Sequence, residues 1–161
     1  MELDTIDIQI LTELQNDGRL TNARLSEKVG LTPSPCLRRL KILERRKVIR
    51  GYRATLDRQR IGLALTVFVG IKVERHRDAD ANAFIRSIEG LPQIISCHLV
   101  SGEYDFLLQV VVPSLRDYDQ FLEGVLLKMP SVRDIRSNFA IRTIKDDAKL
   151  PVATLLQKRS K

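Results

Sequence analysis

The chain has 161 residues, of which 43% are hydrophobic and 29% charged, and its formal net charge is +7. This composition supports one ordinary domain or two small ones with a buried core, and it excludes an intrinsically disordered protein. The longest apolar runs are far shorter than a membrane span, and the opening residues MELDTID lack the apolar region of a secretory signal. The two cysteines, Cys36 and Cys97, have no Cys or His at metal-ligand spacing, so reduced and packed thiols are expected.

The first predicted element is an amphipathic helix that ends at the sequence Asn16-Asp17-Gly18. Its apolar residues recur at intervals of three and four, as one buried stripe requires. They are Leu3, Ile6, Ile10, Leu11 and Leu14. Asp4 is expected to cap this helix, and Asp7 to support its N-terminal dipole.

A second, shorter helix is expected to begin after Thr21, which is a good capping residue. Its Leu25 and Val29 should point inward. Gly30 should close the helix with a positive φ, a backbone conformation that glycine adopts without strain.

The third predicted helix carries a strongly basic face. Thr32 is expected to cap it, with Pro33 at the first helical position. Helical spacing places one set of residues on the apolar face, namely Cys36, Leu40 and Leu43. It places another on the opposite face, namely Ser34, Arg38, Lys41 and Arg45.

Charge is concentrated on this third helix and the segment after it. Residues 38–58 contain nine Lys/Arg and two Asp/Glu, an excess that equals the net charge of the whole chain. Two helices, a glycine turn and a basic helix in this order predict a helix-turn-helix that binds double-stranded DNA. The first turns of the basic helix are expected to reach base edges, through Ser34, Pro35, Arg38 and Lys41. The flanking cations are expected to neutralise phosphates, namely Arg39, Arg45, Arg46 and Arg53.

The pattern changes character near residue 60. Val48-Ile49 and residues 52–56 are expected to pair as a β-hairpin, the wing of a winged helix. Beyond it, the pattern predicts strands at 65–73, 94–100, 106–112 and 132–144 and helices at 80–88 and 115–127. This β-α-β-β-α-β order is typical of a ferredoxin-like domain, so the fold class is α+β. We expect a winged helix-turn-helix in residues 1–57, a linker in 58–64, a ferredoxin-like domain in 65–145 and a loosely docked tail in 146–161.

Four segments of the sequence resemble the Lrp/AsnC family, the leucine-responsive or feast/famine transcriptional regulators of bacteria and archaea. They are Leu3–Arg19, Leu31–Glu44, Val48–Asp57 and His98–Val110, the last of which reads HLVSGEYDFLLQV. The resemblance implies a DNA-binding homodimer, often assembled into tetramers or octamers. It also implies a C-terminal domain, similar to ACT domains, that binds amino acids at subunit interfaces.

The turn Ser101–Asp105 is the candidate effector site. Gly102 can adopt a positive φ, and exposed N–H groups there could hold an α-carboxylate while Asp105 pairs with the ammonium. The resemblance implies an effector near this loop, with neighbours Leu99, Tyr104, Asn138, Phe139 and Ala140. An ordinary hairpin turn, with Asp105 as its local hydrogen-bond acceptor, remains open from the residues themselves.

The chain departs from the family pattern at two positions. The family usually has Gly after the basic helix, where this chain has Lys47, so the helix is expected to end with strain or in a different way. The family often has Glu where Arg24 stands, so a capping box is not expected at the second helix.

These observations predict a transcriptional regulator that responds to an amino acid and acts in the cytoplasm on the nucleoid. An architectural DNA-binding protein without an effector, or an amino-acid-sensing subunit of an enzyme, are the alternatives. The sequence contains no recognisable nucleophile-base pair, metal cluster or phosphate loop. We therefore expect no catalytic activity, no cofactor, no metal and no membrane partner.

Overall fold

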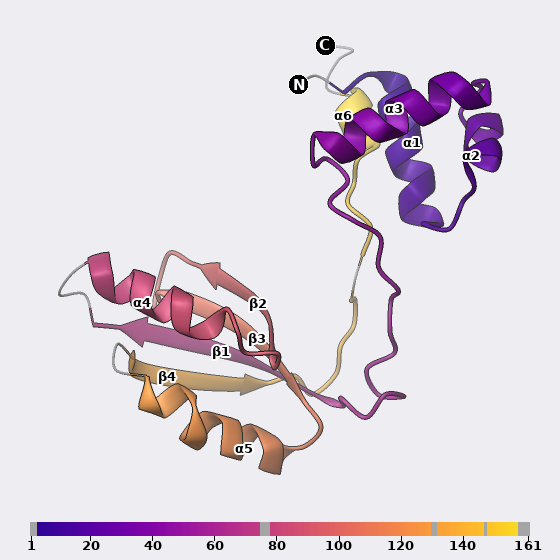
Figure 1. Cartoon of the computed structure of the whole chain (residues 1–161). Coiled ribbons are helices and arrows are strands. Elements are labelled where there is room, and N and C mark those ends of the chain that lie inside the picture. The colour runs from indigo at the N-terminus through magenta and orange to yellow at the C-terminus, as the bar shows by residue number, and fades with distance from the viewer. Residues whose placement is uncertain (1–2, 75–77, 130–131, 147, 158–161) are drawn as a thin grey trace. The chain divides into compact units, whose positions relative to one another are not determined.

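The computed structural model describes residues 3–74, 78–129, 132–146 and 148–157 (Figure 1). Two compact units are present. The helical unit contains Met1–Thr55 together with Lys145–Lys161, and the sheet unit contains Leu56–Ile144. The C-terminal segment therefore belongs to the same unit as the first three helices, although the sheet unit separates them in the sequence.

The helical unit begins with α1 (Thr5–Asn16), whose N-terminus is closed on both sides by carboxylates. The Asp4 side chain accepts a hydrogen bond from the Asp7 N–H at 2.8 Å, and the Asp7 side chain accepts one from the Asp4 N–H at 3.3 Å. This reciprocal arrangement is a capping box, which satisfies two backbone donors that the helix itself cannot. The expected cap at Asp4 is confirmed, and Asp7 contributes more than dipole support.

The next helices are α2 (Asn22–Lys28) and α3 (Pro33–Arg45). The Thr21 side chain caps α2, and Gly30 has the expected positive φ of 67°. Thr32 occupies the cap position of α3, but its hydroxyl makes no capping hydrogen bond. Lys47 follows α3 with a φ of 58°, so the helix ends in the left-handed conformation even without glycine.

One apolar cluster holds the three helices together. Its fully buried members are Ile10, Leu25, Val29, Cys36 and Leu43, and Leu40 packs against them. The predicted inward residues of α2 and α3 are thereby confirmed. Because Cys36 and Leu43 point inward, the opposite face of α3 must point to solvent.

The β-hairpin predicted for the wing is wrong. Residues 51–57 form no strand, and Gly51, with a φ of 156°, interrupts the segment between Ile49 and Tyr52. The Tyr52 hydroxyl instead donates to Glu44 of α3 at 3.0 Å. An isolated two-stranded hairpin without a sheet to join is marginal in water, which accounts for the missing strands in this segment.

The sheet unit has the predicted β-α-β-β-α-β order. It contains β1 (Leu65–Val73), α4 (Asp78–Ile88), β2 (Ile94–Leu99), β3 (Phe106–Val112), α5 (Leu115–Gly124), a 3-10 turn (Leu126–Lys128) and β4 (Val132–Phe139). The strands form one antiparallel sheet in the order β2-β3-β1-β4. The α+β class and the ferredoxin-like topology are confirmed.

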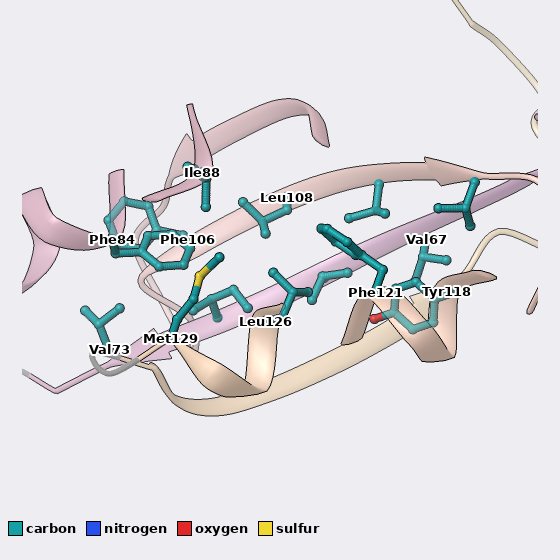
Figure 2. Packing of buried hydrophobic residues seen from close by; sticks show 14 residues of the cluster. Val67, Val73, Phe84, Ile88, Phe106, Leu108, Tyr118, Phe121, Leu126 and Met129 are labelled. Carbon is teal, nitrogen blue, oxygen red and sulfur yellow. The ribbon is translucent and has the colours of Figure 1, made fainter. Parts of the chain in front are cut away.

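Both helices of this unit cover the same face of the sheet, as Figure 1 shows. Figure 2 shows the core between the helices and the sheet. There Val67 and Leu108 from the sheet meet Phe84, Tyr118 and Phe121 from the helices. Phe84 and Phe106 pack against each other with tilted rings whose centres are 4.8 Å apart. The other face of the sheet has no covering layer from this chain among the described residues, and it exposes 38% of Phe68.

The last strand is shorter than predicted. β4 ends at Phe139 instead of continuing to residue 144, and Ile141, which lies beyond its end, is fully exposed. The reason is the partner strand, because β1 begins only at Leu65. The bond from the Ala140 N–H to the Thr66 carbonyl, at 3.0 Å, is the last that β1 can offer.

Lys47→Gly should stabilise the helical unit. A side chain in the left-handed conformation costs about 1 kcal/mol, and glycine removes this cost, so urea denaturation should show a gain of roughly 0.5–1 kcal/mol. Arg46→Gly is the matched control, since it removes the same charge at a φ of −83°. It should destabilise, and equal effects of both variants would contradict the strain at Lys47.

Candidate functional site

The solvent face of α3 carries the predicted DNA-contacting residues. The exposed members are Ser34, Pro35, Arg38, Lys41, Arg45 and Arg46. Among the residues that the structure describes, none of these cations has a salt-bridge partner. An uncompensated row of guanidinium and ammonium groups on one helix face attracts phosphates and can reach guanine edges.

Arg39 has a different environment from its neighbours. Its guanidinium lies 2.6 Å from the Asp4 carboxylate and 2.9 Å from that of Asp7, and only 33% of its side chain is exposed. Partial burial alone would raise the pKa of Asp4, but the Asp7 N–H and the Arg39 guanidinium outweigh it and hold that pKa below its usual value. The expectation of a free flanking cation therefore does not match the structure. Arg39 joins α3 to the capping box of α1.

Tyr52 fixes the segment that follows α3. Partial burial of its ring and the adjacent Glu44 carboxylate raise the pKa of Tyr52 to about 12, so the hydroxyl remains a donor at neutral pH. Arg53 is the next residue and is exposed. A cation is therefore held near α3 without the predicted hairpin.

The candidate effector turn lies between β2 and β3. Gly102 has a φ of 126°, and Ser101, Gly102 and Glu103 are exposed, as a backbone anion site requires. The Asp105 carboxylate accepts the Val73 N–H at 3.0 Å, and the Asp105 N–H donates to the Ile71 carbonyl at 2.9 Å. Asp105 thus has the local acceptor role that the sequence left open, at a half-buried position beside the turn.

Two residues that organise this turn were not predicted from the sequence, namely Gly70 and Arg136. The Tyr104 ring lies directly on Gly70 of β1, where an added Cβ would come within 2.6 Å of Tyr104 Cγ. Arg136 of β4 pairs with Gly70 in the sheet register and makes a salt bridge to Glu103 at 2.8 Å. The lone glycine at an outward position of β1, between Phe68 and Lys72, was the available signal.

The other predicted effector residues are not gathered in one place by a single chain. Asn138 is exposed on the uncovered sheet face, and its amide donates to the Phe68 carbonyl at 3.4 Å. Phe139 points to the helix-covered face and packs edge-on against Tyr118, with ring centres 5.4 Å apart. Leu99 lies on β2 and is 77% exposed, whereas Asn138 and Phe139 lie on β4, the opposite edge of the sheet. Two strands separate these edges, so one chain cannot close a small site around all of them.

The geometry describes a helix-turn-helix with a basic face, followed by a ferredoxin-like unit with an exposed glycine turn. Two family models match the chain in the same order. A model described as winged helix-turn-helix DNA-binding matches residues 3–50, and one described as Lrp/AsnC ligand binding domain matches residues 66–150.

Three similar proteins support the same family assignment. The leucine-responsive regulatory protein of Escherichia coli strain K12 is 40% identical over 153 residues, which are 95% of this chain and 93% of that protein. A transcriptional regulator from Neisseria meningitidis, solved in complex with L-methionine, has a TM-score of 0.90 at 39% identity and covers 96% of this chain and 99% of its own. A feast or famine regulatory protein from M. tuberculosis, complexed with L-methionine, has a TM-score of 0.80 at 33% identity, with coverages of 91% and 97%. The chain belongs to the Lrp/AsnC family of transcriptional regulators.

Arg39→Ala should weaken the helical unit, and the loss should depend on pH. Because Asp4 and Arg39 are partly solvated, we expect about 0.5–1 kcal/mol at neutral pH. The pKa of Asp4 is lowered in the folded state, so its contribution is present above the unfolded pKa and disappears as the pH falls through the folded one. In urea denaturation, wild type and variant should converge between about pH 5 and pH 2. Arg38→Ala is the control with no expected loss, and a pH-independent Arg39→Ala difference would contradict this role.

Gly70→Ala should destabilise the sheet unit. The added methyl group would overlap the Tyr104 ring, and overpacking of this kind costs about 1–3 kcal/mol. Gly90→Ala is the matched control, because a Cβ at Gly90 meets nothing within 4 Å. Calorimetric unfolding with equal melting temperatures for the two variants would rule out the tight Gly70–Tyr104 contact.

Proposed function

We propose that this protein is a sequence-specific transcriptional regulator whose DNA affinity or assembly responds to an amino acid. The observation that carries the proposal is the basic outer face of α3, presented by a helix whose inward Cys36 and Leu43 are fully buried. Such a helix fits the major groove of duplex DNA. The proposed site of action is the bacterial or archaeal nucleoid in the cytoplasm.

The proposed division of labour on DNA follows from position along α3. Ser34, Pro35, Arg38 and Lys41 lie on its first turns and would contact base edges. Arg45, Arg46 and Arg53 lie at its end and beyond, and would neutralise phosphates. Arg39 would act indirectly, because its ion pairs hold α3 against α1.

The proposed effector is a zwitterionic amino acid with an apolar side chain. Two relatives were solved with L-methionine, and the exposed turn at Gly102 offers N–H groups for a carboxylate. Leu99, Tyr104, Phe139 and Ala140 would contact the side chain, with Asp105 and Asn138 near the polar end. An architectural protein without an effector is the outcome to expect if no amino acid binds.

Assembly into at least a homodimer is part of the proposal. Leu99 and Phe139 lie on opposite sheet edges, so a complete site would need edges from two copies. The uncovered sheet face, with its exposed Phe68, also offers a surface that a second sheet would bury. Tetramers or octamers of such dimers, as are common among family members, are compatible with this arrangement.

Arg38→Ala should reduce discrimination between DNA sequences. A bidentate guanidinium contact to guanine contributes about 1–3 kcal/mol to the choice of base, so affinity for a selected duplex should fall by that amount. Affinity for a scrambled duplex should change far less. Competition binding with both duplexes measures the difference, and Arg45→Ala is the control that should weaken both alike. Equal losses on both duplexes for Arg38→Ala would remove the base-reading role.

Asp105→Asn should weaken amino-acid binding while leaving DNA binding without effector nearly unchanged. The amide oxygen can still accept the Val73 N–H, so the fold is retained, but the charge opposite an ammonium is lost. The expected loss is on the order of 1.5–3 kcal/mol, measured by calorimetry with L-methionine. Asp119→Asn, an exposed carboxylate on α5, is the control for charge alone. Unchanged affinity in Asp105→Asn would move the site away from this turn.

A further inference from the structure

The C-terminal segment, residues 148–157, binds back onto the first helix of the chain. The Gln15 side chain, in the last turn of α1, uses both ends of its amide on Leu150. Its oxygen accepts the Leu150 N–H at 2.7 Å, and its nitrogen donates to the Leu150 carbonyl at 3.1 Å. The Lys149 ammonium donates to Asn16 at 2.6 Å. Two adjacent α1 residues thus fix the position of the segment along the helix.

After Leu150 the segment turns into the single-turn helix α6 (Thr154–Gln157), which packs on α1. Leu150 and Val152 of the segment close one side of a cavity of about 500 Å³. We call the receiving surface the α1 groove, lined by Leu3, Leu11, Leu14, Gln15 and residues 48–53. Val152 is half-buried against it, but Leu150 remains 71% exposed, so the segment fills the groove only in part.

The two units are therefore joined by two connections within one chain. Residues 56–64 lead from the helical unit into β1, and residues 140–144 lead away from β4 toward the C-terminal part of the helical unit (Figure 1). β1 and β4 are neighbouring antiparallel strands, with Val67 opposite Phe139. The Ala140 N–H donates to the Thr66 carbonyl at 3.0 Å. Both connections thus leave the sheet side by side, at the strand end where Phe139 and Ala140 lie.

We propose that the α1 groove is the docking surface of the chain's own C-terminal segment, and that this docking lets the sheet unit control the helical unit. The inference rests on the proposed function, because it assigns a route for the amino-acid response. A ligand that moves the end of β4 would pull on or release the segment held by Gln15. The state of α1, to which Arg39 ties α3, would change with it.

The contact has the character of a reversible one. The three hydrogen bonds to Gln15 and Asn16 lie at the surface, where water competes, and ordering ten residues costs conformational entropy of similar size. Covalent attachment raises the local concentration of the segment, which favours docking without making it permanent. Elements of such low local stability are the ones that respond to ligands.

The test uses the full chain, a duplex selected by the wild type, and L-methionine as the probe. Gln15→Ala removes both bonds to Leu150 and keeps a strong helix former in α1. A chain truncated after Asp146 removes the whole segment. Gln9→Ala is the matched control, since Gln9 is an exposed glutamine on the same helix. Two quantities are measured, namely the DNA dissociation constant with and without L-methionine, and hydrogen exchange of residues 148–157.

We expect wild type and Gln9→Ala to show the same amino-acid effect on DNA affinity, on the order of fivefold or more. In Gln15→Ala and in the truncated chain, the ratio of the DNA dissociation constants with and without L-methionine should fall toward one. Both variants should still bind DNA and L-methionine. Protection of residues 148–157 should change with L-methionine in the wild type and be lost in Gln15→Ala.

Three results would overturn the proposal. A full amino-acid effect in both variants would remove the segment from the response and leave the proposed function intact. A wild type whose DNA affinity and segment protection ignore L-methionine would remove the amino-acid response itself. Recovery of the effect on mixing Gln15→Ala with truncated chains would show docking on a neighbouring copy instead of within one chain.

Discussion

Cys36 and Leu43, fully buried beside Ile10, Leu25 and Val29, determine which way α3 is turned. A helix has one rotation that buries a given pair of side chains, so this packing decides which residues meet solvent. Arg38, Lys41 and Arg45 then form an uninterrupted basic face. The Arg39 ion pairs fix the same helix from its edge, where the α1 capping box supplies both carboxylates. The orientation of the proposed DNA-binding face depends on these two contacts.

Local sequence signals predicted the elements that local physics decides. Helical spacing, Thr21, Gly30 and Asp4 marked the first three helices, and the apolar, β-favouring pattern located β1 and β3 with their observed bounds. The failures occurred where a partner strand or side chain decides the outcome. β4 stops where β1 begins, the wing lacks a sheet to join, and Arg39 finds carboxylates 32 and 35 residues away. Periodicity contains no information about such distant partners.

The candidate effector site shows the same division. The sequence identified Gly102 and the turn around it, because a positive φ leaves a local signature. It did not reveal that Tyr104 lies on Gly70 or that Arg136 reaches Glu103, since these contacts join three strands. Resemblance grouped Leu99 with Phe139, which one chain holds on opposite sheet edges. This separation supports the proposed assembly, because a site that contains both residues would need sheet edges from two copies of the chain.

If the cations of α3 hold DNA, duplex binding by the full chain must weaken steeply as the salt concentration rises. Each phosphate that a cation neutralises contributes about −0.9 to the slope of log K against log[salt]. A dimer contacting six to ten phosphates should lose roughly three to five orders of magnitude in affinity between about 50 and 200 mM salt. An affinity that barely changes over this range would contradict the account, because the exposed cations of α3 would then have no part in holding DNA.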